Sequence, residues 1–266
     1  MINVFGKKLN ATRTLVACVF AIGMLLTMSD SAAAEVVEIR QYILGDNGDA
    51  SALDDFLGGA LIPALERLGV GPVGALYPHP SDENNSKSVF VLIPYADANQ
   101  VDATRMALQQ DNQFLTDGKA YLSRGAQDTP IERIRSELVV GMDCWPKTIV
   151  PNASLQNEDR VLELRLYESP NERLGDVKVD MFNNGEVPIF LDCGITPVFI
   201  GQALIGPLTP SLTYLTTYPS EADRVEAWKA FRKHPDWQTL KVVPKYSGTV
   251  NRIDKFVLSP KPYSQM

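Results

Sequence analysis

The chain has 266 residues and a formal net charge of −7 at pH 7. That length allows one large domain or two small ones. An acidic chain without a cluster of Lys and Arg is a poor nucleic-acid binder, because phosphate contacts require clustered positive side chains. No nucleic-acid partner is therefore expected.

The first 34 residues have the pattern of an export signal. Basic residues up to Arg13 precede an apolar run over 15–26, and a small-residue segment, 32–34, follows. We expect cleavage after Ala34, which would make the protein periplasmic or secreted. The stretch 15–18 resembles a lipobox, but the apolar residues continue past it. The run is shorter than the roughly 20 residues of a membrane-spanning helix, and no stable span is expected after cleavage.

The first half of the mature chain, 35–142, predicts the order strand, helix, strand, strand, helix, strand. Apolar residues in the first helix recur at the 3.6-residue spacing of an amphipathic helix. The second helix has a predicted break near Gly118. The predicted strands are 36–42, 70–77, 89–95 and 131–140, and the predicted helices are 51–68 and 98–122.

A linker and a second half with the same plan follow. Residues 143–159 are rich in Pro, Asn and Ser, which is typical of a connection between domains. The second half, 160–262, predicts strands at 161–167, 196–204, 212–218 and 249–258, and helices at 173–191 and 220–233.

The two halves align as a duplication. An offset of 125 residues matches 36–42 with 161–167 and Pro63 with Pro188. The offset becomes 123 and then 119 further along, and the changes fall in predicted loops, where insertions are tolerated.

The predicted order βαββαβ is the ferredoxin-like motif. It gives an α+β unit whose antiparallel sheet has helices on one face and a bare apolar face on the other. A bare apolar face must be covered. We therefore expect two tandem ferredoxin-like units packed sheet to sheet as an intrachain α+β barrel.

Both halves resemble NIPSNAP domains. The resemblance is carried by the strand patterns Val-Val-Glu-Ile-Arg-Gln-Tyr (36–42) and Val-Leu-Glu-Leu-Arg-Leu-Tyr (161–167). It is also carried by the aromatic and basic run 227–237, which ends in His-Pro-Asp-Trp, and the second half is the closer match. The resemblance implies a dimeric α+β barrel fold, which small cofactor-free monooxygenases share. It implies no activity, because the family has no agreed catalytic residues.

Strand alternation selects a candidate site. Side chains two residues apart on a strand share a face, so the charged and tyrosine positions of each first strand form a row. We expect both rows to point into the barrel and the leucines 162, 164 and 166 to pack on the helices. The candidate ligand-binding residues are Glu38, Arg40, Tyr42, Glu163, Arg165, Tyr167 and Tyr214.

In this hypothesis an arginine holds an anionic or carbonyl oxygen of a small organic ligand, and the tyrosines add hydrogen bonds or a stacking wall. The alternative is structural. Each glutamate then pairs with the arginine two residues away, or with one across the barrel, and only stabilises the fold, because buried charges must be paired.

Other residues carry little signal for chemistry. The two histidines, His79 and His234, belong to no metal-spacing motif, so no metal and no cofactor are expected. Cys193 aligns with Leu68 at the end of the first helix, which predicts a buried apolar position rather than a disulfide with Cys144.

Three function classes remain open. The first is a small-molecule binding protein with its ligand between the two sheets. The second is a cofactor-free monooxygenase or isomerase with Tyr or Glu as acid and base. The third is a structural or interaction module with a filled barrel. Further self-association of the protein is left open.

Overall fold

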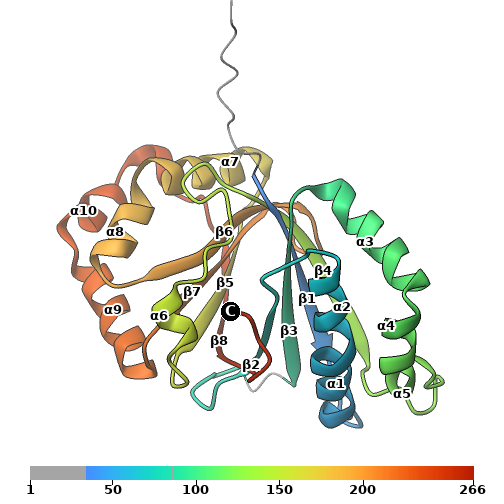
Figure 1. Cartoon of the computed structure of the whole chain (residues 1–266). Coiled ribbons are helices and arrows are strands. Elements are labelled where there is room, and N and C mark those ends of the chain that lie inside the picture. Colours follow the sequence, from blue (N-terminus) through green and yellow to red (C-terminus); the bar gives the residue numbers. More distant parts are fainter. Residues whose placement is uncertain (1–33, 85–86) are drawn as a thin grey trace, which may run out of the picture. The chain divides into compact units, whose positions relative to one another are not determined.

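The computed structural model describes residues 34–84 and 87–266. The predicted export signal lies outside the described residues. Eight antiparallel strands form a closed barrel in the order β1-β3-β2-β8-β5-β7-β6-β4 (Figure 1). The strands are β1 (Val36–Ile43), β2 (Gly74–Pro78), β3 (Ser88–Tyr95), β4 (Arg133–Gly141), β5 (Val161–Glu168), β6 (Thr196–Ile205), β7 (Ser211–Tyr218) and β8 (Arg252–Pro260).

Each half contributes four neighbouring strands to this barrel. The first half gives β4-β1-β3-β2 and the second gives β8-β5-β7-β6, so corresponding strands occupy the same places in the two halves. The halves join where β2 pairs with β8 and where β4 pairs with β6. The barrel closes only because each half supplies both of its edge strands to the other, which leaves no open sheet edge.

The helices cover the outside of the barrel in two groups (Figure 1). The first half supplies α1 (Ala50–Phe56), η1 (Leu57–Leu61), α2 (Ile62–Arg67), α3 (Ala98–Gln110), α4 (Asn112–Asp117) and α5 (Lys119–Leu122). The second half supplies α7 (Glu172–Met181), η2 (Phe182–Glu186), α8 (Val187–Asp192), α9 (Glu221–Lys233), α10 (Pro235–Leu240) and η3 (Pro244–Tyr246). A short helix, α6 (Asn152–Leu155), lies in the predicted linker.

The predicted first helix of each half is one continuous helix with a π-helical turn inside it. These turns, η1 and η2, occupy corresponding positions in the two halves. Pro63 and Pro188 follow near the start of the next α-helical segment. A proline ring clashes with the carbonyl four residues earlier in a regular α-helix, and the wider π turn makes room for it. The predicted break near Gly118 is present, and Asp111 adds a second break before α4.

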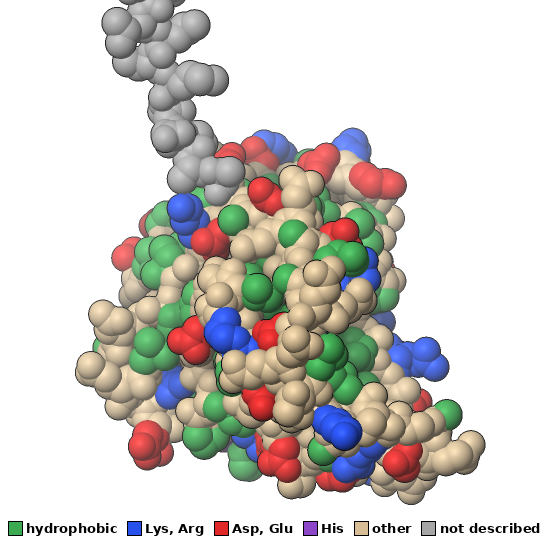
Figure 2. All heavy atoms as spheres, turned by 45° about the vertical axis from the view of Figure 1, so that its right-hand side comes forward, with side chains coloured by type: hydrophobic (Ala, Val, Ile, Leu, Met, Phe, Trp, Pro, Cys, Tyr) green, Lys and Arg blue, Asp and Glu red, His purple; other side chains and the backbone are tan. Residues whose placement is uncertain are grey.

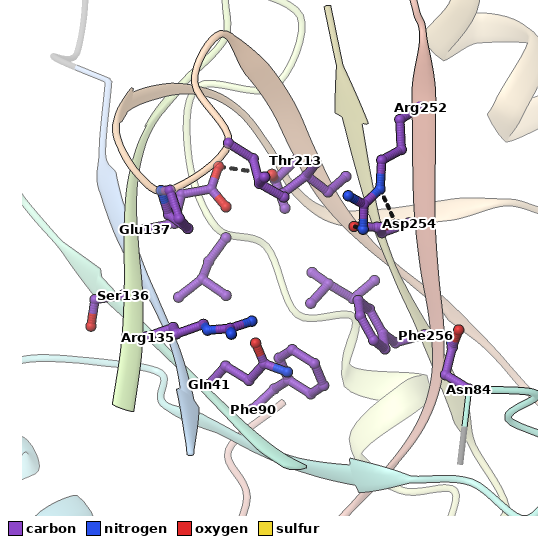
Figure 3. A pocket seen from close by; sticks show the side chains of 15 residues that line it. Gln41, Asn84, Phe90, Arg135, Ser136, Glu137, Thr213, Arg252, Asp254 and Phe256 are labelled. Atoms are coloured by element: carbon purple, nitrogen blue, oxygen red, sulfur yellow. Dashed lines mark hydrogen bonds and ion pairs between the residues drawn. The ribbon is translucent and has the colours of Figure 1, made fainter. Parts of the chain in front are cut away.

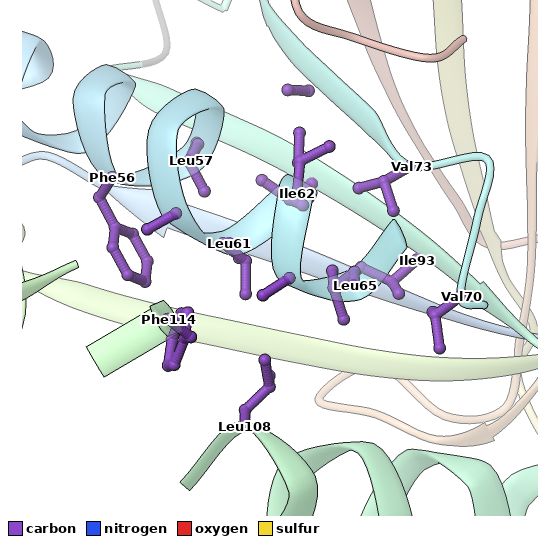
Figure 4. Packing of buried hydrophobic residues seen from close by; sticks show 14 of the residues in the cluster. Phe56, Leu57, Leu61, Ile62, Leu65, Val70, Val73, Ile93, Leu108 and Phe114 are labelled. Carbon is purple, nitrogen blue, oxygen red and sulfur yellow. The ribbon is translucent and has the colours of Figure 1, made fainter. Parts of the chain in front are cut away.

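Three apolar clusters hold the molecule together. One lies between the first group of helices and the sheet, where Phe56, Leu61, Leu65 and Phe114 interlock (Figure 4). A second lies under the helices of the other half. The third fills the middle of the barrel with residues from both halves. The two halves therefore share one of the three cores. Burying each large apolar side chain in it contributes about 1.5–3 kcal/mol.

The surface mixes charges of both signs. On the face drawn in Figure 2, Lys and Arg side chains are interspersed with Asp and Glu side chains. Within the described residues, no helix combines the length and the apolar character that crossing a membrane requires. Cys144 and Cys193 are both free thiols. Cys193 caps the end of α8 and packs against the second apolar cluster, as expected, but it is only partly buried.

Candidate functional site

The first predicted row lies between the sheet and the helices of its own half. The guanidinium of Arg40 donates to both carboxylate oxygens of Glu38, at 2.7 and 2.9 Å. Tyr95 and Ser136 donate to the same carboxylate at 3.2 and 3.1 Å. Tyr42 is buried in the apolar cluster under the first helices. All of these hydrogen-bond partners of Glu38 therefore come from strands of the first half.

The second row is tied even more tightly to its helices. Glu163 is fully buried and accepts hydrogen bonds from Arg165 at 2.7 Å and from Arg224 at 2.9 Å. The indole N–H of Trp228 donates to it at 2.6 Å. The Arg165 guanidinium also lies 3.6 Å from the centre of the Trp228 ring, in cation–π geometry. One strand carboxylate thus anchors helix α9 through two side chains.

The expectation that the two rows face each other inside the barrel is wrong. The inward side chains are instead the alternate ones, Val37 and Ile39 on β1 and Leu162 and Leu164 on β5, which fill the barrel centre. Period-two alternation separates the two faces of a strand, but it does not say which face turns inward. Both faces of this sheet are covered. The apolar rows fill the barrel centre, and the charged rows face the helices, where Glu163 is paired with side chains of α9.

The predicted tyrosines of the second half do meet. The hydroxyls of Tyr167 and Tyr214 lie 2.8 Å apart, and Arg165 donates to the Tyr167 hydroxyl at 3.3 Å. Tyr214 is completely buried, and burial raises its pKa well above the ordinary value of 10.0. This hydroxyl therefore stays protonated and can donate a hydrogen bond.

A pocket of about 400 Å³ opens beside these residues, between the β5–β8 part of the sheet and the helices of the second half. We call it the helix-side pocket. Its aromatic lining comes from the sheet, from α9, from α10 and from η3. The lining residues are Arg165, Tyr167, Lys178, Met181, Glu186, Trp228, Phe231, Arg232, Trp237, Lys241, Tyr246, Gly248, Thr249, Val250 and Ile253.

The four cationic side chains of this pocket differ in what they already bind. Arg165 is paired with Glu163, and Lys178 forms a buried salt bridge of 2.7 Å with Glu186. Arg232 and Lys241 form no salt bridge with a carboxylate of residues 34–84 or 87–266, and both are exposed. The pocket thus has two cations without a protein partner in the described chain beside an aromatic wall, an arrangement that attracts a planar anion.

Sequence reasoning predicted part of this site. Arg165 and Tyr167 line the helix-side pocket, and Tyr214 supports it from behind. The residues of the first half, which lie under their own helices, are not brought to this pocket. Arg232 was missed although it lies in the aromatic and basic run 227–237, and Lys241, which lies beyond that run, gave no signal.

A search of curated proteins finds no match. The family model described as NIPSNAP matches residues 162–265. The second half of the chain is a NIPSNAP domain. Every residue of the helix-side pocket lies inside that domain.

Solved structures with a similar fold include two described as putative monooxygenases. The one from Fusobacterium nucleatum is 12% identical, with a TM-score of 0.55, and the match covers 86% of this chain and 93% of that chain. The one from Lactobacillus acidophilus is 12% identical, with a TM-score of 0.52, and covers 85% and 94%. A NIPSNAP-like domain protein from Burkholderia xenovorans is 20% identical, with a TM-score of 0.37, and covers 41% of this chain and 90% of its own. At these identities, the two longer matches establish a shared fold and nothing more.

Proposed function

We propose that this protein binds a small aromatic anion in the helix-side pocket of its NIPSNAP domain. The observation that carries the proposal is the pairing of Arg232 and Lys241, neither in a salt bridge within the described residues, with the walls formed by Trp228 and Trp237. Pockets that hold small molecules combine mainly apolar and aromatic walls with a few placed polar groups. Arg165 and Tyr167 keep their predicted role as polar contacts at the sheet side.

The geometry restricts the ligand by charge and by shape. The indole of Trp237 lies 4.5 Å from the ring of Phe231, and Trp228 packs against the same phenylalanine at 5.5 Å. A flat ring would extend this aromatic wall. A carboxylate on that ring would reach the guanidinium of Arg232 or the ammonium of Lys241, because both side chains are long and exposed. The volume of about 400 Å³ suits a compound of one or two rings.

The duplication supports the same proposal at the level of the fold. We infer that residues 35–142 and 160–262 are two copies of one ferredoxin-like unit. Matching strand orders and matching π-helical turns support this inference. The copies differ under their helices, since Phe56 stacks on Tyr121 at 4.1 Å in the first half. We propose that the second copy has kept the ligand site, and that residues 1–34 export the protein.

Tryptophan fluorescence tests the binding proposal directly, because two of the three tryptophans line the pocket. We expect 1-naphthoate to quench the fluorescence of a W145F variant, and neutral 1-naphthalenemethanol to bind more weakly. The double variant R232Q/K241Q should lose about tenfold or more in naphthoate affinity, since charge-assisted hydrogen bonds are the strong ones. K229Q on the same helix is the matched control, because Lys229 pairs with Glu226 at the surface. Equal naphthoate affinity in R232Q/K241Q and K229Q would contradict the proposal.

A second candidate is a monooxygenase that oxidises the bound compound. It is favoured by the shared fold with two putative monooxygenases and by the Tyr167–Tyr214 hydroxyl pair beside Arg165. The compound would supply the electrons, as a dihydroxyarene can. Oxygen consumption with hydroquinones should then fall in Y167F, in which the phenol that accepts from Arg165 is gone. Equal oxygen consumption with and without the protein would contradict the monooxygenase candidate and favour the binding protein.

A further inference from the structure

One end of the barrel is hollow. A cavity of about 360 Å³ lies there inside the barrel, next to the apolar side chains that fill the barrel centre. We call it the barrel-end cavity. It is lined by Ile39, Gln41, Asn84, Phe90, Arg135, Ser136, Glu137, Leu164, Leu166, Pro207, Leu208, Thr213, Arg252, Asp254 and Phe256. Both halves line it, and it contains none of the seven predicted site residues.

Two arginines line this cavity, and they differ in their carboxylate partners within residues 34–84 and 87–266. Arg252 is held by Asp254 through two hydrogen bonds of 2.9 Å. Arg135 forms no salt bridge with any carboxylate in the described part of the chain. Its guanidinium extends into the cavity near the amide of Gln41 (Figure 3). An arginine in this situation offers a planar fork of donors that matches a carboxylate.

Glu137 lies two residues further along β4, on the same face of the strand. It is only 8% exposed and accepts hydrogen bonds through one oxygen, Oε1, from Ser211 at 3.2 Å and from Thr213 at 3.1 Å. Figure 3 shows the bond from Thr213. Burial raises the pKa of this carboxyl, and the two hydroxyls offset only part of that effect. A raised pKa extends the neutral form of this carboxyl to higher pH, and a neutral carboxyl can donate a hydrogen bond.

Gly206, in the loop after β6, has no side chain and so makes room for Glu137. A Cβ atom added at Gly206 would lie 2.8 Å from Cγ of Glu137, closer than such contacts allow. The opposite wall is apolar, because the rings of Phe90 and Phe256 pack at 4.8 Å and Leu166 lies beside them on β5. The cavity therefore has a cationic and hydrogen-bonding side on β4, an apolar side formed by Phe90, Leu166 and Phe256, and the paired charges of Arg252 and Asp254 on β8.

We propose that the barrel-end cavity is a second binding site, specific for a small aliphatic monocarboxylate. Arg135 holds the carboxylate, Glu137 donates a hydrogen bond to it, and the apolar chain lies against Phe90, Phe256 and Leu166. A phosphate fits less well, because its additional negative charge would be repelled by Asp254 and would lose its hydration against the apolar wall. The cavity is at the small end of the range for ligand pockets, which suits a chain of about six to eight carbons. This site is independent of the helix-side pocket.

Calorimetric titration of the full mature chain with octanoate tests the proposal, with 1-octanol as the uncharged probe of the same length. We expect octanoate to bind and octanol to bind at least about tenfold more weakly. R135Q should weaken octanoate binding by about tenfold or more, since it removes charge-assisted hydrogen bonds. R105Q makes the same charge change at an exposed helix residue already paired with Asp102, and should bind octanoate like the unmodified protein.

Two further variants separate this site from the other pocket and from misfolding. G206A should displace Glu137 and weaken octanoate binding while leaving Arg135 in place. R232Q/K241Q should bind octanoate normally, even if its naphthoate binding is lost. Circular dichroism melting verifies that each variant is folded. The proposal is overturned if R135Q binds octanoate as tightly as R105Q does, if octanol binds as well as octanoate, or if R232Q/K241Q abolishes octanoate binding.

Discussion

Glu163 shows how much of the second half depends on a single carboxylate. It has no exposed surface, and three donors from β5 and α9 converge on it. Two of them, Arg224 and Trp228, come from a helix about 60 residues further along the chain. Removing one partner of a buried ion pair leaves the other charge buried and uncompensated, which costs more than the pair itself contributes.

We therefore expect E163L to lower the free energy of unfolding by about 3 kcal/mol or more, and E163Q to lower it by less, because an amide oxygen still accepts hydrogen bonds. Urea denaturation followed by tryptophan fluorescence measures both. The control is E226Q on α9, which breaks the exposed pair with Lys229 and should change stability by no more than about 0.5 kcal/mol. Equal losses in E163L and E226Q would show that the buried network is not important for stability.

At the scale of elements, the segment after β8 links the two halves. Its last residue, Met266, is buried in the barrel core, and Arg160 donates to its carbonyl at 2.8 Å. Lys261 and Tyr263 both donate to Asp54 on α1, with Tyr77 as a third donor. One helix carboxylate in the first half thus anchors the segment that leaves the second half.

The titration of Asp54 makes this anchor sensitive to acid. Partial burial by itself would raise the pKa of Asp54, but the hydrogen bonds from Lys261, Tyr263 and Tyr77 outweigh it and lower the pKa below 3.8. A carboxyl with a depressed folded-state pKa stabilises the fold above its unfolded value, and that contribution is lost as the pH falls below it.

D54N should accordingly lower the urea midpoint at pH 7, and the difference from the unmodified protein should shrink as the pH is lowered from 4 towards 2. D55N is the control, because the carboxylate of Asp55, next to Asp54 in the sequence, is exposed. A D54N difference that stays constant between pH 7 and pH 2 would argue against the anchor.

At the scale of the whole molecule, the barrel makes the two halves interdependent. The cluster at its centre takes Val37 and Leu92 from one half and Leu164 and Leu258 from the other. A separated half would expose this apolar face and two unpaired sheet edges, which favour aggregation.

Residues 35–157 and 158–266 produced separately should therefore be insoluble or self-associated. Produced together, they should form a 1:1 complex with the circular dichroism spectrum of the intact chain. Size-exclusion chromatography with light scattering distinguishes these outcomes. A monomeric, cooperatively folded half of either kind would show that the shared core is dispensable.

The order of the strands and helices and the amphipathic character of the helices followed from the sequence alone. Local periodicity carries this information, because a helix stripe such as the one around Leu57 and Leu61 depends only on neighbouring residues. The duplication stays a prediction; the aligned prolines Pro63 and Pro188 both lie at the start of an α-helical segment that follows a π-helical turn. The predicted Glu–Arg pairing two residues apart also rests on local geometry, and it is present on both β1 and β5.

Only the tertiary structure decided which strand face lies inside the barrel. Both faces of β5 are covered, so alternation between Leu164 and Arg165 could not tell the interior from the helix layer. The deciding partners, Arg224 and Trp228, lie far away in sequence and meet Glu163 only after folding. Arg135 and Glu137 on β4 likewise gave no signal as a site, because Thr213 and Phe256 come near them only when the barrel closes.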